Sequence, residues 1–414
     1  MSSEFHPTTL GKLVNFSNGR SSPERFEDGK YPVFGSNGLI GRANEANAPP
    51  SSIVVGRVGS YCGSVHFSQQ PCWVTDNAIK ATAKDKNSPE FLFYLLKHLD
   101  LNNWRSGSGQ PLINQATLNA IEVFAPEPDE QREIGKFIGA LDDRITLLRE
   151  TNVTLDSICQ ALFKSWFVDF DPVRAKLEGR APEGMDEATA GLFPDGFEES
   201  ELGLVPRGWR VLRLGDATER ITKGTTPTTL KRPFVEMGIN FVKAESMTGD
   251  GGFIAEKFAF IDDETHELLR RSQLQEGDVL ISIAGTIGRI AVMTKDHLPA
   301  NTNQAVALVR PLHSVFPSGL VNRFLRLSES QQSMGEKVVQ AVQANLSLGT
   351  LSDLKVVVPP ESVVVRLYES GLAQIDASWT ANDQRVRTLA TLRDTLLPRL
   401  ISGQLRLSTL AGTD

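Results

Sequence analysis

The chain has 414 residues, 40% of them hydrophobic and 22% charged, and its net charge at pH 7 is −7. This length predicts two or more domains, and the composition excludes global disorder. The sequence contains no apolar run near the roughly 20 residues of a membrane-spanning helix and no secretory signal pattern. Its three cysteines form neither a disulfide framework nor a set of zinc ligands. We therefore expect an intracellular, cytoplasmic protein.

The negative charge is concentrated in one central segment. Residues 126–208 carry 9 Lys and Arg against 18 Asp and Glu, whereas the segments on either side are close to neutral. A near-neutral module can still bind DNA if a local basic patch or a basic partner protein holds the phosphates.

Two similar modules are predicted, one in each half of the chain. Each combines short β-branched runs, bounded by turn-forming residues, with one helical stretch. The runs are Ser52–Val55, Val65–Phe67 and Val279–Ile283, and the helical stretches are Phe91–Leu99 and Gly319–Leu327. We predict an α+β fold with twisted sheets in each module.

The chain order defines five segments. A segment rich in Pro, Gly and acidic residues has no apolar period, so we expect a connector that contributes nothing to a core. The five segments are 1–125 (first module), 126–180 (central helix), 181–208 (linker), 209–357 (second module) and 358–414 (C-terminal helix).

The second half of the chain repeats the first at a spacing of roughly 225 to 235 residues, which indicates a duplicated domain. The similar segments occur in the same order in both halves. They are Leu10–Leu13 with Leu212–Gly215, Ile53–Gly59 with Val279–Gly285, Gly63 with Gly288, Thr75–Ile79 with Thr302–Val306, and Ile121–Pro126 with Leu354–Pro359. The glycines fit tight turns between strands better than a phosphate-binding loop.

A long helical pattern follows each module. Apolar residues alternate at steps of four and three from Ile138 to Trp166 and from Leu372 to Leu400, which is a heptad seam. Each seam contains one central asparagine, Asn152 or Asn382. The two helices could lie separately on their own modules, or they could pair with each other. Pro398 is expected to end or kink the second helix.

Antiparallel pairing gives a consistent register if Asn152 faces Asn382. Ile145 then faces Leu389 and Leu148 faces Val386, whereas one layer, Leu141 against Arg393, is poor. The seam from Ile138 to Trp166 would be about 40–45 Å long. Two similar modules held at the ends of such a spacer match two DNA half-sites somewhat more than one helical turn apart.

The sequence lacks the common catalytic motifs. It has no Walker-type phosphate loop, no dinucleotide fingerprint, no histidines at metal-ligand spacing and no G-x-S-x-G nucleophile elbow. It also lacks the Asn/Asp-Pro-Pro-aromatic motif with which an amino-methyltransferase holds a flipped base. We therefore expect no catalysis by this chain, no catalytic residue and no metal site.

Several motifs together resemble the specificity (S) subunit of type I restriction-modification enzymes, over essentially the whole chain. These motifs are Leu155–Phe170 followed by Asp171-Pro172-Val173, Leu192–Asp195, Glu201–Trp209, Leu392–Leu405, Tyr31–Gly38 and Gly224–Pro227.

The resemblance implies two target-recognition domains separated by antiparallel helices, with an asymmetric, two-part DNA target. It implies assembly with two modification subunits that bind S-adenosylmethionine and methylate adenine N6, and with restriction subunits that translocate and cut DNA using ATP and Mg. Those cofactors would belong to the partner subunits and none to this chain. No membrane association is implied.

Base readout uses Arg or Lys on guanine, Asn or Gln on adenine, and small hydroxyl groups, all on loops. For the first module the candidates are Arg20, Ser36, Asn37, Arg57, Arg105, Ser106 and Gln110. For the second module they are Lys223, Thr225, Thr226, Lys231, Lys243, Arg289 and Gln343. An ordinary surface turn explains any single one of them equally well.

Apolar residues in excess of the seam predict a partner surface. The seam uses Trp166 at its end, which leaves Phe163 and Phe167 over, and we expect them to be exposed. The candidate partner-binding residues are Phe163, Trp166, Phe167, Leu396, Leu397 and Leu400.

Two other classes of protein remain as alternatives. One is a coiled-coil interaction scaffold whose modules bind a ligand other than DNA. The other is a fused methyltransferase-nuclease, although this chain lacks the catalytic motifs. Sequence-specific retention on duplex DNA in the presence of the methyltransferase subunit distinguishes the first alternative from a specificity subunit.

Overall fold

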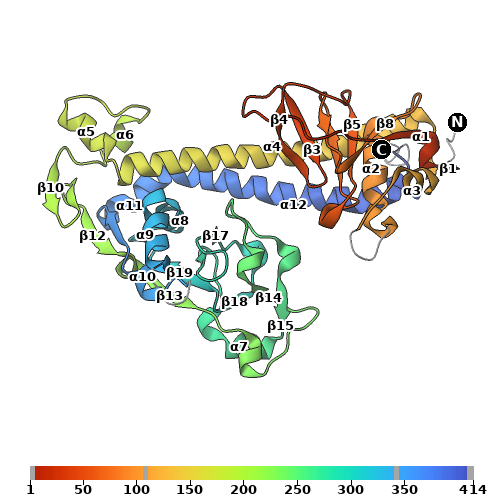
Figure 1. Ribbon diagram of the computed structural model, residues 1–414. Coiled ribbons are helices and arrows are strands. Elements are labelled where there is room, and N and C mark those ends of the chain that lie inside the picture. The colour runs from red at the N-terminus through yellow and green to blue at the C-terminus, as the bar shows by residue number, and fades with distance from the viewer. Residues whose placement is uncertain (1–4, 106–110, 340–344, 408–414) are drawn as a thin grey trace, which may run out of the picture. The chain divides into compact units, whose positions relative to one another are not determined.

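The computed structural model describes residues 5–105, 111–339 and 345–407 (Figure 1). The chain divides into two compact units, the first made of Met1–Leu148 with Arg385–Asp414 and the second of Arg149–Gln384. Two long helices, α4 (Pro128–Phe167) and α12 (Ala373–Ile401), each contribute one part to each unit.

The first unit contains two sheets and a short pair of strands. A four-stranded antiparallel sheet has the order β2-β8-β5-β6, a three-stranded sheet has the order β4-β3-β7, and β1 pairs with β9. The strands are β1 (His6–Thr9), β2 (Val14–Asn18), β3 (Tyr31–Gly35), β4 (Gly38–Ala43), β5 (Ser52–Gly56), β6 (Val65–Ser68), β7 (Trp73–Val74), β8 (Ala78–Ala83) and β9 (Glu122–Ala125).

Short helices cover the main sheet of the first unit. They are α1 (Leu10–Leu13), the 3-10 turns η1 (Gly59–Tyr61) and η2 (Leu101–Trp104), α2 (Pro89–His98) and α3 (Gln115–Ala120). The start of α2 is fixed by Pro89 and by the Ser88 hydroxyl, which accepts a hydrogen bond from the backbone N–H of Phe91. Phe91, Leu92 and Leu96 of α2 are fully buried in the core under the sheet.

The second unit repeats this arrangement with its own strands. The four-stranded order is β13-β19-β16-β17, the three-stranded order is β15-β14-β18, and β12 pairs with β20. The strands are β10 (Phe197–Ser200), β11 (Gly203–Pro206), β12 (Arg210–Arg213), β13 (Thr218–Lys223), β14 (Ile239–Val242), β15 (Ala259–Ile261), β16 (Val279–Ser282), β17 (Ile290–Val292), β18 (Ala300–Thr302), β19 (Val306–Pro311) and β20 (Lys355–Val358).

The helices of the second unit are short apart from the two long ones. The α-helices are α5 (Asp171–Leu177), α6 (Glu187–Ala190), α7 (Asp263–Leu268), α8 (Ser318–Arg326), α9 (Ser328–Val339), α10 (Leu348–Ser352) and α11 (Glu361–Leu367). The 3-10 turns are η3 (Leu214–Ala217), η4 (Pro227–Leu230), η5 (Ala244–Ser246), η6 (Ala255–Lys257), η7 (Arg270–Ser272) and η8 (Lys295–His297).

The predicted duplication is confirmed by the topology of the sheets. In both three-stranded sheets the middle strand, β3 or β14, has one antiparallel and one parallel neighbour. The matched glycines also have matched conformations, with φ of 76° at Gly59 and 73° at Gly285, and 86° at Gly63 and 89° at Gly288. These left-handed conformations favour glycine, so the glycines form turns after β5 and β16, as the sequence indicates.

In both units the segments of α4 and α12 lie side by side and antiparallel (Figure 1). In the second unit, Asn382 Nδ2 donates a hydrogen bond to Asn152 Oδ1 at 3.1 Å, which is the predicted register. In the first unit, Ile145 and Leu148 pack in one cluster with Val386 and Leu389. The prediction that the two helices pair with each other is therefore confirmed.

The poor layer at Arg393 is resolved by an ion pair that the apolar pattern does not reveal. Arg393 Nη1 lies 2.6 Å from Asp142 Oδ1, one residue beyond Leu141, and the Tyr94 hydroxyl of α2 donates to the same carboxylate at 2.8 Å. Burial beside Asp142 raises the pKa of Tyr94, so the hydroxyl keeps its proton and remains a donor.

The two predicted helical segments are each divided. Helix α4 ends at Phe167 and Phe170 adopts a left-handed conformation with φ of 57°, after which α5 begins at Asp171. The C-terminal segment comprises α11, a π-helical turn at Tyr368–Leu372 and α12. Pro398 does not end α12, which continues to Ile401, because proline near the end removes a single backbone donor.

The segment 181–208 is more than the predicted connector. It contains α6 and the hairpin of β10 and β11, and Phe193 and Val205 are only 2% exposed. Phe193 belongs to the core of the second unit together with Trp209. Isolated apolar residues of this segment are therefore buried although the segment has no apolar period. A search for periodicity does not detect such residues.

Replacing Asn152 and Asn382 together by leucine removes a buried polar pair from an apolar seam. The free energy of unfolding should therefore rise by about 1–2 kcal/mol, and the melting temperature should rise with it. Asn152→Leu alone should lower it, because the Asn382 amide then loses the Asn152 acceptor. Thermal unfolding of both variants checks this, and a single variant more stable than the double one would contradict it.

Candidate nucleic-acid interface

One end of the first unit gathers four loops that the sequence separates widely. The Ser36 hydroxyl, between β3 and β4, donates to the backbone carbonyl of Asn77, and Arg57 N donates to the same carbonyl at 2.9 Å. Arg57 Nη1 also lies 3.4 Å from Asp76 O, and Arg20 forms a parallel bridge with Thr75. We call these loops, with Arg20, Ser36, Asn37, Arg57, Asp76 and Asn77, the first loop edge.

The second unit has a corresponding edge after β13 and before β19. The backbone N–H of Gly224 donates to Asn303 O at 3.0 Å, and the Thr226 hydroxyl bonds to the Gln304 side chain. Lys223 is the last residue of β13, and Thr225 lies in the loop that follows it. We call Lys223, Gly224, Thr225, Thr226, Asn303 and Gln304 the second loop edge.

A close-approach glycine positions each edge. The sequence analysis named Gly224 only as part of a family motif and did not single out Gly19. A Cβ on Gly19 would lie 2.0 Å from Thr75 O, and one on Gly224 would lie 1.7 Å from Thr302 O. Since Thr75 and Thr302 are matched in the repeat, the same backbone crossing supports both edges. In both repeats a glycine directly follows a strand-like run, and this shared pattern could have indicated the crossing from the sequence.

The structure separates the candidate base contacts into three groups. Arg20, Asn37, Arg105, Lys223 and Lys231 are exposed, whereas Ser36, Arg57, Thr225, Thr226, Lys243 and Arg289 are half-buried. Ser106, Gln110 and Gln343 lie outside the described residues.

Two half-buried candidates outside the loop edges, Lys243 and Arg289, also have structural partners. Arg289 Nη1 donates to Met247 O at 2.8 Å, and Lys243 lies over the Phe234 ring with Nζ 5.0 Å from its centroid. Lys243 is also 3.8 Å from Glu245. These contacts fix both side chains against their own unit, so the exposed residues of the two loop edges are the better candidates for reading bases.

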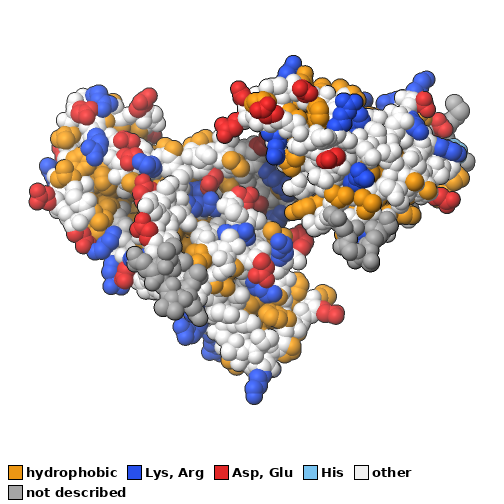
Figure 2. Space-filling view, in the orientation of Figure 1, with side chains coloured by type: hydrophobic (Ala, Val, Ile, Leu, Met, Phe, Trp, Pro, Cys, Tyr) orange, Lys and Arg blue, Asp and Glu red, His pale blue; other side chains and the backbone are white. Residues whose placement is uncertain are grey.

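The charged surface is mixed. On the face drawn in Figure 2, Lys and Arg side chains are interspersed with Asp and Glu and form no continuous basic band. On this face, phosphate binding would therefore need local clusters or a partner.

The prediction that Phe163 and Phe167 are exposed is wrong. Phe163, Phe167 and Trp166 are 1%, 3% and 7% exposed. Phe193 and Trp209 from the adjoining segment pack on Trp166 and Phe167, and Phe163 stacks on Phe167. An aspartate at either phenylalanine would place a charge in the core of the second unit instead of only removing a partner contact.

The leucines predicted for partner binding are also largely covered. Leu400 is fully buried in the core of the first unit, and Leu396 and Leu397 are half-buried against that core. They anchor the end of α12 to the first module, so they are not free to form a partner surface.

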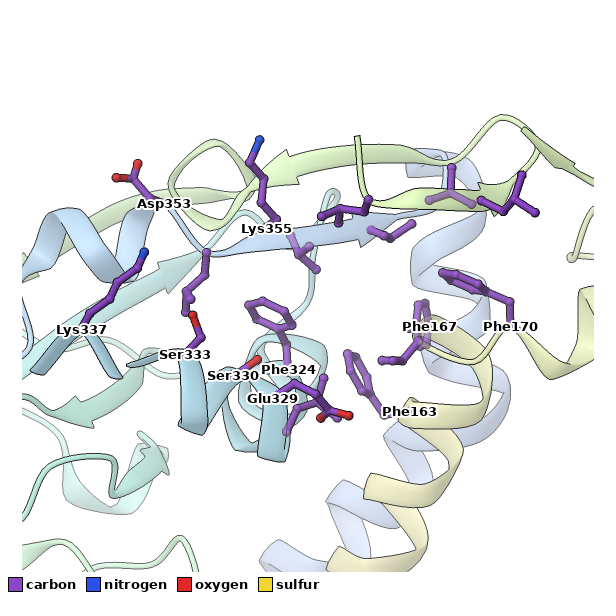
Figure 3. Close-up of a pocket in the computed structure, with 18 residues that line it drawn as sticks. Phe163, Phe167, Phe170, Phe324, Glu329, Ser330, Ser333, Lys337, Asp353 and Lys355 are labelled. Carbon is purple, nitrogen blue, oxygen red and sulfur yellow. The ribbon is translucent and has the colours of Figure 1, made fainter. Parts of the chain in front are cut away.

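A groove of about 480 Å³ lies beside this aromatic core in the second unit. Phe163 and Phe167 of α4 and Phe324 of α8 point toward its floor, as Figure 3 shows. Its rim carries charged side chains from α9 and β20, and the hairpin of β10 and β11 adds Leu202 and Leu204, which are 50% and 61% exposed. The rim residues are Glu329, Lys337, Asp353 and Lys355.

Neither metal ligands nor reactive thiols are gathered in the described part of the chain. Within it, no group of three or more His, Cys, Asp or Glu side chains is arranged to hold a metal ion, and no helix has the length and apolarity to cross a membrane. The three cysteines are buried and unpaired, and burial raises the pKa of the Cys159 thiol to about 11.

Comparison with known proteins identifies the family. The description "Type I restriction modification DNA specificity domain" matches residues 2–157 and 206–364. The chain therefore belongs to this family of type I restriction-modification specificity subunits, as its motifs indicate. The family favours DNA specificity over the alternative of a scaffold with another ligand.

Individual relatives agree over most of the chain. The type I restriction enzyme HindI specificity subunit of Haemophilus influenzae is 28% identical over 77% of this chain and 77% of its own length. The MjaIX specificity subunit of Methanocaldococcus jannaschii is 22% identical over 84% of this chain and 76% of its own. The crystal structure of a type I S subunit from Mycoplasma genitalium has the same fold, with a TM-score of 0.60, 17% identity and coverage of 97% and 96%.

Gly224→Ala should displace the second loop edge, because its methyl group would meet Thr302 O. We expect a loss of about 1–3 kcal/mol of stability and weaker DNA binding. The matched control is Gly249→Ala, where a Cβ meets nothing within 4 Å. Thermal unfolding of the two variants checks this, and equal melting temperatures would show that the crossing is not tight.

Proposed function

We propose that each of the two modules reads one part of an asymmetric, two-part DNA sequence through its loop edge. The observation that supports this proposal is that the two units share one fold but expose different side chains at their loop edges. Both units place a loop edge after the same glycine crossing, and the residue directly after the glycine is Arg20 in the first unit and Thr225 in the second. Asn37 adds an exposed amide to the first edge, and Lys223 adds an exposed ammonium group to the second. Different donors and acceptors on one scaffold suit two different half-sites.

The chemistry of these side chains fits readout in the major groove. Asn37 can donate to adenine N7 and accept from adenine N6, and Arg20 or Lys223 can donate to guanine O6 and N7. Since the loops are fixed by hydrogen bonds such as Ser36 to Asn77 and Thr226 to Gln304, these exposed side chains are held with little freedom to reorganise.

We further propose that this chain carries no catalytic group and directs the activity of its partners. Those partners are two modification subunits, which would bind S-adenosylmethionine and methylate adenine, and restriction subunits, which would use ATP and Mg. The absence of methyltransferase and phosphate-loop motifs from the sequence supports this division of labour. The complex would act on double-stranded DNA in the cytoplasm.

The groove beside α4 is the surface that we propose for a modification subunit. Its floor is aromatic, and Leu202 and Leu204 of the adjoining hairpin remain half or more exposed in the isolated chain. Exposed apolar side chains next to an apolar groove are typical of protein interfaces. This surface replaces the predicted one at Phe163 and Phe167, which form only its floor.

The reading of half-sites is tested by Asn37→Ala in the first loop edge and Lys223→Gln in the second. Each should relax the methylated motif at one base pair of one half only, since losing a base contact costs about 1–3 kcal/mol at that position. Mapping of N6-methyladenine in cells that carry each variant measures this. The proposal would be contradicted if both variants reduced methylation equally whatever the base at each position of the motif.

Partner docking is tested by Leu202→Ser with Leu204→Ser. Binding of the modification subunit should weaken at least tenfold, because each leucine buried in an interface contributes about 1.5–3 kcal/mol. Leu230→Ser with Leu268→Ser is the matched control, since these leucines are 44% and 56% exposed but lie outside the groove. Co-purification checks this, and unchanged assembly of the first pair would exclude the groove.

A further inference from the structure

Three arginines line one cleft of about 460 Å³ on the second unit. Arg220 comes from the edge strand β13, and Arg270 and Arg271 come from the turn η7, with Ile221 and Thr222 completing the lining. Arg271 Nη2 lies 3.4 Å from Thr222 Oγ1, which joins the two sides of the cleft. All three arginines are exposed, so their charges face solvent.

These charges are not used by the fold. Among the described residues, no carboxylate lies within 4.0 Å of Arg220 or Arg271, and Arg270 has only an exposed pair with Glu267 at 3.4 Å. Arg310, directly opposite Arg220 on β19, is in contrast tied to a carboxylate. Its Nε and Nη2 atoms each donate a hydrogen bond of 2.8 Å to the buried Asp278. The buried carboxylate of Asp278 is thus paired with Arg310 and needs none of the three cleft arginines. The exposed pair of Arg270 with Glu267 contributes little to stability.

The turn that carries two of the arginines is held rigidly from below. Asn301, fully buried on β18, donates to Leu269 O at 3.1 Å and to Ser272 Oγ at 3.2 Å. Arg310 Nη2 donates to Gln273 O at 3.1 Å. Buried polar side chains therefore fix the backbone on both sides of Arg270 and Arg271, which is how a pre-organised anion site is built.

The cleft lies on the strand that leads into the second loop edge. Arg220 precedes Lys223 by three residues, which is about 10 Å along a strand, and the major groove of B-DNA is about 12 Å wide. A phosphate in the cleft would therefore belong to the backbone beside the bases that the loop edge reads. The equivalent strand β2 of the first unit, Val14–Asn18, contains no Lys or Arg.

We propose that the cleft of Arg220, Arg270 and Arg271 binds phosphate groups of the DNA backbone and anchors the second module on its half-site. This inference rests on the proposed function. The contact is independent of sequence, so it adds affinity on every duplex and sets the register from which the second loop edge reads bases.

The test uses the full chain in its complex with the modification subunits. A double variant that carries both Arg220→Gln and Arg271→Gln is compared with the wild type. Dissociation constants are measured over a range of salt concentrations, on the mapped target duplex and on a random duplex. The slope of log affinity against log salt should fall by about 1.8, because each phosphate that an arginine neutralises contributes about 0.9 to this slope. Affinity for both duplexes should fall by the same factor, and the methylated motif should not change.

The matched control is Arg210→Gln with Arg366→Gln, two exposed arginines of the same unit that do not line the cleft. Arg220→Gln alone, with a slope change of about 0.9, keeps the test valid if the double variant unfolds. An unchanged salt slope, or a loss of affinity confined to the target duplex, would overturn the inference while leaving the proposed function intact. Failure of the wild-type complex to prefer any sequence would overturn both.

Discussion

The pairing of α4 with α12 organises both units, because each unit contains one part of each helix. The seam is apolar around Asn152 and Asn382, and their hydrogen bond defines which residues face one another. A one-heptad slip would place each amide against an apolar side chain and leave its polar atoms unpaired, which costs about 1–3 kcal/mol per group. Each module packs on the parts of α4 and α12 that belong to its own unit.

Each module is joined to the helix pair by a polar contact as well as by apolar packing. In the first unit, Tyr94 and Arg393 meet on Asp142. In the second unit, Arg323 of α8 is 4% exposed and bonds to Asp156 of α4 and to Asp376 of α12, the latter at 2.6 Å. Arg323 is buried, so removing its carboxylate partners would cost about 3–5 kcal/mol, whereas Arg393 and Asp142 are 21% and 25% exposed and their pair contributes less.

The periodic features of the fold could be predicted from the sequence. The alternation of Ile145, Leu148 and their partners predicts the helix pair, and the order of matched segments predicts the duplicated sheets. The burial of the aromatic residues at the end of α4 could not be predicted in this way. Phe163 stacks on Phe167, and Trp209 and Phe193, which pack on Phe167 and Trp166, are isolated in a segment without a period. The pairing of Arg393 with Asp142 was hidden for a similar reason, since a heptad pattern ranks positions only by apolarity.

The candidate site was predictable in residue type but not in arrangement. Arg20, Asn37 and Lys223 lie at the ends of strands or in loops as expected, yet the contacts that bring these segments together join residues far apart in the sequence, such as Ser36 with Asn77. The arginine cleft depends on Asn301, which fixes a one-turn helix too short to leave a pattern. The two units thus share one scaffold and differ in the side chains that their loop edges expose.

We propose that this chain sets the DNA sequence at which its complex methylates adenine. A genome-wide map of N6-methyladenine, made in cells with this chain and in cells lacking it, tests this role. We expect one asymmetric, two-part motif to lose its methylation when the chain is absent and to regain it when the chain is restored. Identical maps in the two kinds of cell, with the modification subunits present in both, would contradict it.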